Sequence, residues 1–380
     1  MPHAPQVRKL SLVDYRSFAT LDLELDSPMV ALCGPNGAGK TNILEALSML
    51  SPGRGLRRAA LGDCARIGGG GGFVVSVMLG DAATSLQLGT GLLPGETGRK
   101  ARINREPVGS ASAFAEYVRV LWLTPAMDGL FSGTPGERRR FLDRLVLALD
   151  SGHGARVTAM ERALSGRNRL LEAPYPDQTW LDACERELSE VAVAVAAARC
   201  QAVSKLNGLI VSHRDEASVF PWAELTLQGE LEGALESLPA LEVEDRYSEI
   251  LRVSRPRDAA AGRTLRGPHA SDLAVRHGPK QIEAGRASTG EQKALLTGLV
   301  IAHARLVAEM SGIAPLLLLD EIAAHFDPLR RRALFDELAC LGGQVWMSGA
   351  DPQHFADLTE HAMVFQVEAG TVRQRRVVPR

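Results

Sequence analysis

A glycine-rich run combines a lysine and a hydroxyl in a spacing that suits phosphate binding. Residues 34–41 read Gly-Pro-Asn-Gly-Ala-Gly-Lys-Thr, which is the pattern G-x-x-x-x-G-K-T. An apolar run, residues 29–33, precedes it, and a helical pattern, residues 42–50, follows it. A strand, a tight glycine turn and a helix start together point backbone N–H groups and the positive end of a helix at one anion. The motif therefore predicts a nucleoside triphosphate site.

The residue types in this phosphate-binding loop (P-loop) have different expected roles. Gly37 and Gly39 keep side chains away from the phosphates, whereas Lys40 reaches the β- and γ-phosphates and is a candidate catalytic residue. The hydroxyl of Thr41 is placed to ligate Mg²⁺. The residues expected to bind the nucleotide are Gly34, Pro35, Asn36, Gly37, Ala38, Gly39, Lys40, Thr41 and Asn42.

Two carboxylates end an apolar run in the C-terminal third. Residues 315–321 read Pro-Leu-Leu-Leu-Leu-Asp-Glu, which predicts a buried strand of the Walker B type. Asp320 is expected to help hold Mg²⁺, and Glu321 to orient or deprotonate the attacking water. We expect this strand to lie directly beside the P-loop strand, because both carboxylates then come next to the γ-phosphate.

Polar segments flank the Walker B strand on both sides. Upstream, residues 287–293 read Ala-Ser-Thr-Gly-Glu-Gln-Lys before an apolar helix, and serine and glycine at a helix start offer N–H groups and a hydroxyl to an anion. Downstream, residues 323–327 read Ala-Ala-His-Phe-Asp, and residues 343–348 form a strand-like run. In this order the segments resemble the signature loop, the D-loop and the switch strand of ABC-type ATPases.

The secondary-structure pattern changes along the chain. Residues 7–25 predict an antiparallel hairpin that leads into the P-loop strand, and further strand-like runs continue to about residue 107. Long helical patterns follow, at residues 134–150, 155–171 and 180–210. Beyond Pro256, glycine, proline and short strands return.

We therefore expect an α/β fold, an ABC-type P-loop ATPase head with an N-terminal antiparallel β-rich section and an inserted α-helical lobe. Residues 1–110 form the N-terminal part of the head with the P-loop (Walker A), and residues 111–260 form the lobe. Residues 261–380 form the C-terminal part of the head, with the signature loop, Walker B and the D-loop.

The composition is that of an ordinary globular protein, with 380 residues and 45% hydrophobic content. No apolar run is long enough to span a bilayer and the start of the chain does not resemble a signal peptide, so we expect a cytoplasmic protein. The five cysteines show no metal-ligand spacing and are expected to be reduced and mostly buried. The net charge of −2 argues against general DNA binding, so any DNA contact must come from a local basic patch.

Several longer segments are more specific than the Walker motifs. They are Ser-Pro-Gly-Arg at 51–54, Gly-Thr-Pro-Gly-Glu-Arg-Arg-Arg-Phe-Leu-Asp at 133–143, Gly-Pro-His at 267–269 with Asp272 and Leu273, and S-x-G-x-Q at 288–292. With them, the chain resembles the RecF family, the bacterial recombination-mediator ATPases of the ABC/SMC superfamily, nearly from end to end.

This resemblance implies a mechanism. ATP would drive dimerisation, with each P-loop facing the signature loop of the other copy and the D-loop residue Asp327 nearby. The signature residues that would act in trans are Ser288, Thr289, Gly290, Glu291 and Gln292. The homodimer would bind gapped DNA at junctions of single and double strands. RecR and RecO would be its partners in loading RecA for repair and SOS induction, with no membrane involved.

The chain departs from the family pattern at several positions. Asp320-Glu321 replaces a common pair of aspartates, and Ala270 and Ser271 stand where an arginine and an aspartate are usual. Lys293 replaces an arginine after the signature, and Ser348-Gly349 replaces a threonine pair in the switch strand. The Q-loop glutamine and the γ-phosphate sensor are not assignable from these patterns.

Basic residues gather in three places along the sequence, and four arginines are the preferred candidates for DNA contact: Arg54, Arg57, Arg58 and Arg139. Three other functions use a similar head. An ABC transporter subunit would have a compact coupling region in place of the helical lobe, and an SMC-like structural protein would need longer coiled-coil arms. A repair nuclease would need an additional carboxylate and histidine cluster, which is not seen.

Overall fold

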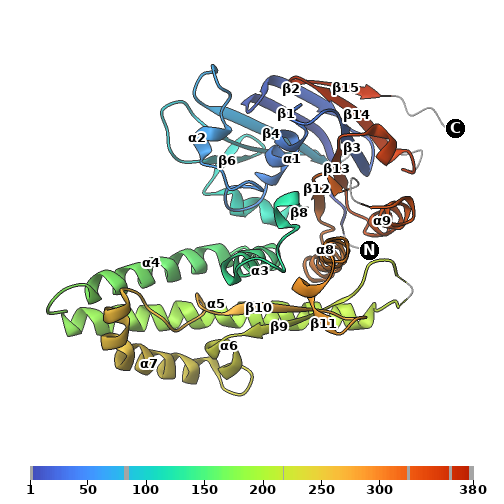
Figure 1. Cartoon of the computed structure of the whole chain (residues 1–380). Coiled ribbons are helices and arrows are strands. Elements are labelled where there is room, and N and C mark those ends of the chain that lie inside the picture. Colours follow the sequence, from blue (N-terminus) through green and yellow to red (C-terminus); the bar gives the residue numbers. More distant parts are fainter. Residues whose placement is uncertain (1–2, 81–84, 217, 323–325, 359–361, 376–380) are drawn as a thin grey trace. The chain divides into compact units, whose positions relative to one another are not determined.

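The structure is a computed structural model that describes residues 3–80, 85–216, 218–322, 326–358 and 362–375 (Figure 1). The chain forms two compact units. The P-loop unit comprises residues 1–128, 217–220 and 289–380, and the helical unit comprises residues 129–216 and 221–288. The division lies elsewhere than the predicted boundaries. The reason is that residues 120–123 form a strand of the P-loop unit, and residues 272–277 pair with a strand of the helical unit.

A six-stranded, largely parallel sheet carries the P-loop. Its strand order is β15-β14-β3-β13-β12-β8. The strands are β3 (Met29–Cys33), β8 (Val120–Leu123), β12 (Leu316–Leu319), β13 (Val345–Gly349), β14 (Ala362–Glu368) and β15 (Thr371–Arg375). The expectation that the Walker B strand lies directly beside the P-loop strand is wrong, because β13 pairs in parallel with both β3 and β12 and separates them.

The central strands β3, β13 and β12 are buried along their whole length, as their apolar sequences require. The helices of this unit are α1 (Lys40–Ser48), α2 (Leu61–Cys64), α8 (Thr289–Ser311) and α9 (Pro328–Cys340). Helix α1 contacts β12 and β13, and α8 contacts β8. The sequence predicts no apolar run of this length, but among the described residues one helix, α8, is long and apolar enough to cross a membrane, with a mean hydropathy of 1.3. The same stretch is 67% buried within the protein, as expected for a core helix.

A second, antiparallel sheet of the P-loop unit has the order β2-β1-β4-β5-β6-β7. Its strands are β1 (Val7–Tyr15), β2 (Phe18–Glu24), β4 (Phe73–Gly80), β5 (Ser85–Leu92), β6 (Lys100–Ile103) and β7 (Glu106–Val108). The predicted N-terminal hairpin and the β-rich section are therefore confirmed. The β1–β2 turn is tight, because Asp14 and Arg16 both have positive φ, at 48° and 52°.

The helical unit combines helices with a three-stranded antiparallel sheet. The helices are α3 (Pro135–Leu149), α4 (His153–Leu171), α5 (Gln178–Ser212), α6 (Glu230–Ala234) and α7 (Ala240–Ala261), and the strands are β9 (Ala223–Gln228), β10 (Asp272–His277) and β11 (Ile282–Glu283). The three predicted helical patterns are confirmed as α3, α4 and α5. Helix α7 contains Pro256 and continues to Ala261.

Candidate nucleotide-binding site

The P-loop connects β3 to α1 through backbone that only glycine tolerates at two points. Gly34 has φ +153°, and a Cβ there would lie 2.2 Å from the carbonyl oxygen of Val367. Gly39 has φ +112°, and its Cβ would lie 2.9 Å from the Ser17 hydroxyl oxygen. The first glycine lets β14 pack against the loop, and the second lets the β1–β2 turn approach the start of α1.

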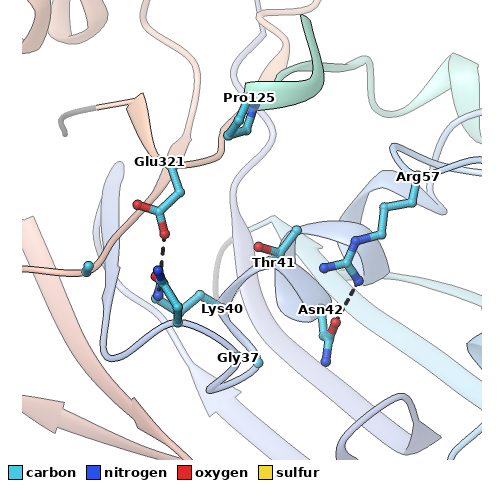
Figure 2. A pocket seen from close by; sticks show the side chains of 10 residues that line it. Gly37, Lys40, Thr41, Asn42, Arg57, Pro125 and Glu321 are labelled. Carbon is cyan, nitrogen blue, oxygen red and sulfur yellow. Dashed lines mark hydrogen bonds and ion pairs between the residues drawn. The ribbon is translucent and has the colours of Figure 1, made fainter. Parts of the chain in front are cut away.

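The P-loop borders a cavity of about 560 Å³ within the P-loop unit (Figure 2). The lining residues are Asn36, Gly37, Gly39, Lys40, Thr41, Asn42, Arg57, Pro125, Glu321 and Ala350. Six of them are residues that the sequence predicts to bind the nucleotide. The other three predicted nucleotide-binding residues, Gly34, Pro35 and Ala38, belong to the loop but do not line the cavity.

Lys40 and Glu321 face each other across this cavity (Figure 2). The Lys40 ammonium donates hydrogen bonds to the carbonyl oxygens of Gly34, at 2.7 Å, and Pro35, at 3.0 Å. It also lies 3.4 Å from Glu321 Oε1, and only 4% of the Lys40 residue is exposed. A largely buried cation at the end of a glycine loop suits a phosphate, and the carboxylate beside it can accept a proton.

Thr41 and Asp320 come together from the P-loop and the Walker B strand. The Thr41 hydroxyl donates to Asp320 Oδ1 at 3.0 Å and to Oδ2 at 3.1 Å. A hydroxyl and a carboxylate are the oxygen ligands that Mg²⁺ prefers, and in nucleotide sites this ion takes its remaining ligands from phosphates and water. The donor set therefore fits the predicted metal, and Asp320 is 8% exposed.

Glu321 has a left-handed backbone, with φ +52°. This conformation costs a non-glycine residue on the order of 1–3 kcal/mol, and it persists only where surrounding contacts impose it. The Glu321 amide donates a hydrogen bond to the Ser348 hydroxyl at 3.0 Å. The same hydroxyl donates to Asp320 Oδ1 at 2.6 Å. Ser348 on β13 thus contacts both Walker B residues, although β13 separates β12 from the P-loop strand.

Arg57 lies at the opposite end of the cavity, next to the first turn of α1 (Figure 2). It donates to Asn42 Oδ1 at 2.8 Å and to Glu45 Oε2 at 3.2 Å. Glu45 is fully buried and also accepts hydrogen bonds from Nε and Nη2 of Arg16, at 2.8 and 2.7 Å, which raises the pKa of Arg16. Two cations thus share one buried carboxylate, which leaves Arg57 with spare donors toward the cavity.

The signature residues lie at the start of α8. Ser288, Thr289 and Gly290 are exposed, Glu291 is half-buried and Gln292 is buried. Within the P-loop unit, residues 289–292 are not among the residues that line the P-loop cavity. The exposure of Thr289 and Gly290 leaves these two residues accessible to a second molecule.

The D-loop prediction is only partly within the described residues, because residues 323–325 lie outside them. Asp327 caps α9 and accepts a hydrogen bond from the Arg330 amide at 3.0 Å, which lowers the pKa of this exposed carboxyl. Phe326 beside it is buried. The structure therefore shows a helix cap at the position where the resemblance places a D-loop aspartate.

The other arginines proposed for DNA contact differ in environment. Arg54 and Arg58 are exposed in the P-loop unit. Arg139 is half-buried in the helical unit and donates to the carbonyl oxygen of Ser271, and burial lowers its pKa. Exposure thus favours Arg54 and Arg58 over Arg139 as cations available to a large partner.

The segments 133–143 and 267–273 meet inside the helical unit. Arg138 holds Asp272 through two hydrogen bonds of 2.8 and 2.7 Å, and Arg199 of α5 holds Asp143 through two of 2.8 and 2.9 Å. Arg199 also donates to the Pro268 carbonyl oxygen at 2.7 Å. These sequence motifs therefore build a structural network that joins α3, α5 and β10.

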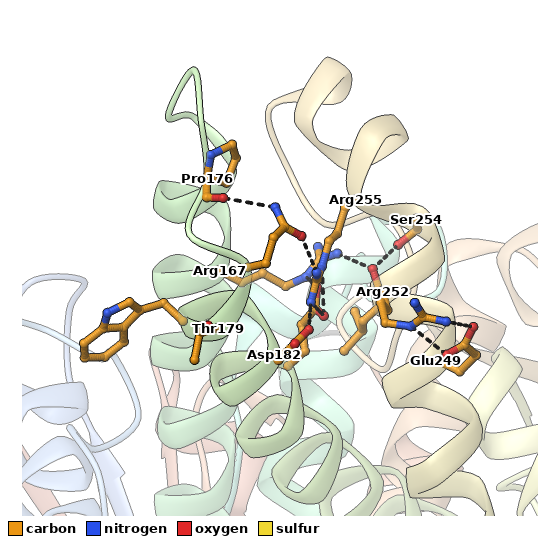
Figure 3. A network of polar contacts seen from close by, with 12 residues as sticks. Arg167, Pro176, Thr179, Asp182, Glu249, Arg252, Ser254 and Arg255 are labelled. Atoms are coloured by element: carbon orange, nitrogen blue, oxygen red, sulfur yellow. Dashed lines mark hydrogen bonds and ion pairs between the residues drawn. The ribbon is translucent and has the colours of Figure 1, made fainter.

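Buried charges also tie α4, α5 and α7 together (Figure 3). Arg167 is fully buried and binds Glu185 at 2.9 Å, Asp258 at 2.7 Å and the carbonyl oxygen of Leu251 at 2.7 Å. Arg255 binds the same Glu185 carboxylate. Arg255, which belongs to a basic group of the sequence together with Arg252 and Arg257, is thus engaged inside the unit.

Two predictions about smaller features have different outcomes. The five cysteines are free, as expected, but only Cys33 and Cys64 are buried, so the expectation of mostly buried thiols is wrong. Cys340 is exposed because it ends α9 on the side away from the core. Among the described residues, no group of three or more His, Cys, Asp or Glu side chains could hold a metal ion.

Sequence patterns did not identify three residues of the site. Pro125 and Ala350 reach the cavity only because of the strand order, and neither carries a recognisable motif. Ser348 has a weak signal, since it is a hydroxyl at the carboxyl end of an otherwise apolar, buried strand. A buried polar residue in such a place requires a hydrogen-bond partner, which could have marked it.

Comparisons with known proteins agree with this site. A family model described as an AAA domain matches residues 9–60, which include the P-loop. The DNA replication and repair protein RecF of Rhizobium etli (strain CIAT 652) is 50% identical over 374 residues, covering 98% of this chain and 100% of the relative. The RecF protein of Rhizobium meliloti (strain 1021) is 51% identical, with 98% and 100% covered.

Solved structures show the same fold at lower sequence identity. A RecF–ATP structure superposes with a TM-score of 0.85 at 20% identity and covers 99% of each chain. The Smc head domain from Pyrococcus furiosus, with an extended coiled coil, superposes with a TM-score of 0.52 at 14% identity, covering 98% of this chain and 96% of the Smc chain. The predicted α/β fold of an ABC-type ATPase head with a β-rich section and helical segments is confirmed. On the near-complete match to its curated relatives, this chain belongs to the RecF family of ABC-type ATPases.

Proposed function

We propose that the chain is an ATP-dependent DNA-binding protein of recombinational repair that uses nucleotide as a dimerisation switch. The observation that carries this proposal is the separation of the two motifs within the P-loop unit. The cavity is lined by the P-loop and Glu321, whereas residues 289–292 lie outside it and Thr289 and Gly290 are exposed. A second copy can supply its own signature residues, including Ser288, and ATP then joins two subunits at a symmetric interface.

The described residues have distinct tasks in this mechanism. Lys40 and the P-loop amides bind the phosphates, and Glu321 orients the attacking water or accepts its proton. Thr41 and Asp320 would hold Mg²⁺, which neutralises phosphate charge when bound. We expect a weak ATPase.

The DNA-binding part of the proposal rests on exposed arginines and on family membership. Arg54 and Arg58 are exposed, and Arg57 borders the nucleotide cavity between them in sequence. Arg139 remains a weaker candidate because it is half-buried. We further propose that the dimer recognises gapped DNA in the cytoplasm and acts with RecR and RecO to load RecA and support SOS induction.

The experiment is a binding titration with gapped and intact duplex DNA, in the presence of ATP, ADP or no nucleotide. We expect ATP to tighten binding to gapped DNA by about 5- to 150-fold, the usual range of coupling between two sites. Affinity should also fall steeply with salt, because arginines displace counterions from phosphates. Lys40→Arg is the matched control: it keeps the positive charge, but ATP should no longer tighten its binding to gapped DNA.

Two outcomes would contradict the proposal. If the DNA affinity is the same with ATP, with ADP and without nucleotide, nucleotide binding is not coupled to DNA binding. A flat salt response would exclude phosphate contacts as the source of affinity. Retrieval of the protein with membrane proteins, without DNA binding, would instead support the alternative of an ABC transporter subunit.

A further inference from the structure

Ser348 occupies the strand that separates the two Walker strands. It lies on β13, in register with Leu32 of the P-loop strand, and it is fully buried. Its hydroxyl is 2.6 Å from Asp320 Oδ1 and 3.0 Å from the Glu321 amide nitrogen. One hydroxyl therefore contacts the side chain of one Walker B residue and the backbone of the next.

The direction of these hydrogen bonds is fixed by chemistry. The Glu321 amide can only donate, so the Ser348 oxygen accepts from it, and the Ser348 proton is left for Asp320. Asp320 thus receives one hydroxyl from Ser348 and one from Thr41.

The second contact acts on backbone conformation. Glu321 has φ +52°, a backbone conformation that residues other than glycine adopt only under constraint. In this conformation its carboxylate reaches to 3.4 Å from Lys40, in the cavity. The Ser348 hydroxyl binds the amide nitrogen of this residue and so stabilises the turn that aims the carboxylate.

We propose that Ser348 is a positioning residue that sets Asp320 for Mg²⁺ and Glu321 for the attacking water. It does not reach the nucleotide itself. Ser348 is fully buried, and the residue that lines the cavity at the end of this strand is Ala350, which has no polar side chain. This inference rests on the proposed ATP-binding function and assigns a role to a strand that separates the two Walker motifs.

The test compares Ser348→Ala with Ser348→Thr, which keeps the hydroxyl. The probes are ATP and Mg²⁺, in a titration of nucleotide affinity with EDTA and with increasing Mg²⁺, followed by steady-state hydrolysis. For Ser348→Ala we expect unchanged ATP affinity in EDTA and a Mg²⁺ requirement raised about 10- to 100-fold, as for other residues that support metal ligands. The kcat should fall by a similar factor with little change in KM, and Ser348→Thr should restore both.

Hydrogen exchange gives a readout that does not depend on activity. The amide of Glu321 should exchange faster in Ser348→Ala than in the wild type, because its acceptor is lost. Ser27→Ala is the control, since Ser27 is 3% exposed, bonds to Met29 and lies outside the cavity. It should leave the Mg²⁺ requirement and the exchange of Glu321 unchanged.

The outcomes separate this inference from the proposed function. If the wild type binds ATP and Ser348→Ala has the same Mg²⁺ requirement and kcat as the wild type, only the role of Ser348 is overturned. Equal losses in Ser348→Ala and Ser27→Ala would show a general loss of stability and would also overturn it. A wild type that does not bind ATP would overturn the proposed function and this inference together.

Discussion

At the scale of single residues, the nucleotide site is set by a few buried side chains with more than one partner. Glu45 binds Arg16 and Arg57, and Asp320 accepts hydroxyls from Thr41 and Ser348. The P-loop and both carboxylates could be predicted from the sequence, because their residue types follow from phosphate and metal chemistry. The supporting partners could not, since they come from segments whose proximity depends on the folded sheet.

Arg57 provides a test at this scale. Because it lines the cavity, Arg57→Ala should weaken ATP binding about 10- to 100-fold, which corresponds to the loss of one hydrogen bond to a charged group. Glu45 stays paired with Arg16, so the fold should persist. Fluorescent ATP titration would measure the effect.

Arg54→Ala is the matched control for that variant, because Arg54 is exposed and does not line the cavity. It should keep ATP affinity and lose DNA affinity. If Arg57→Ala and Arg54→Ala both bind ATP like the wild type, the assignment of Arg57 to the nucleotide site is wrong.

Asp143 gives a pH-dependent prediction. Burial alone would raise its pKa, but hydrogen bonds from His153 and Arg199 outweigh burial and hold the pKa below the ordinary value of 3.8. A carboxyl with a depressed folded pKa stabilises the fold above the unfolded pKa, and this stability is lost as the pH falls through the folded pKa. We therefore expect the helical unit to lose stability below about pH 4.

The measurement is urea unfolding followed by hydrogen exchange of α3 and α5 across this pH range. Asp143→Asn should be less stable at neutral pH and should show a flatter decline on acidification. Asp245→Asn, an exposed acid of α7, serves as the control and should keep the wild-type profile. A wild-type profile for Asp143→Asn would contradict the role given to this carboxylate.

At the scale of elements, periodicity predicted most helices and strands, but not the order of the strands. The helical patterns gave α3, α4 and α5, and the alternation in residues 7–25 gave the hairpin. The Walker strands were wrongly expected to be neighbours, because one-dimensional patterns carry no information on which parallel strand inserts between two others. Pro256 lies inside α7, and Arg255 and Asp258 on either side of it are held by the buried charge network.

That network predicts a large effect of one substitution. Arg167→Met would leave Glu185 and Asp258 without this buried partner, which costs about 3–5 kcal/mol when one member of a buried pair is removed. Amides of α4, α5 and α7 should lose protection in hydrogen exchange. Arg169→Met, at an exposed position of the same helix, should change stability by less than about 0.5 kcal/mol. If Arg167→Met and Arg169→Met change the stability equally, the buried charge network does not stabilise the helical unit as proposed.

At the scale of the whole molecule, the central claim is that one chain carries half of each composite site. The P-loop, Glu321 and the pair of Thr41 and Asp320 form one half, and the exposed start of α8 forms the other. Nucleotide can shift the population toward dimer only if the dimer binds it better than the monomer does. On this proposal ATP would contact both halves through its γ-phosphate, a group that ADP lacks.

Sedimentation of the full chain with ATP, ADP or no nucleotide tests this claim most directly. We predict a doubled mass with ATP only. Lys40→Arg should remain monomeric with ATP, and Ser288→Arg should bind ATP but also remain monomeric. The same mass with ATP and ADP, or loss of ATP binding in Ser288→Arg equal to that in Lys40→Arg, would contradict the account.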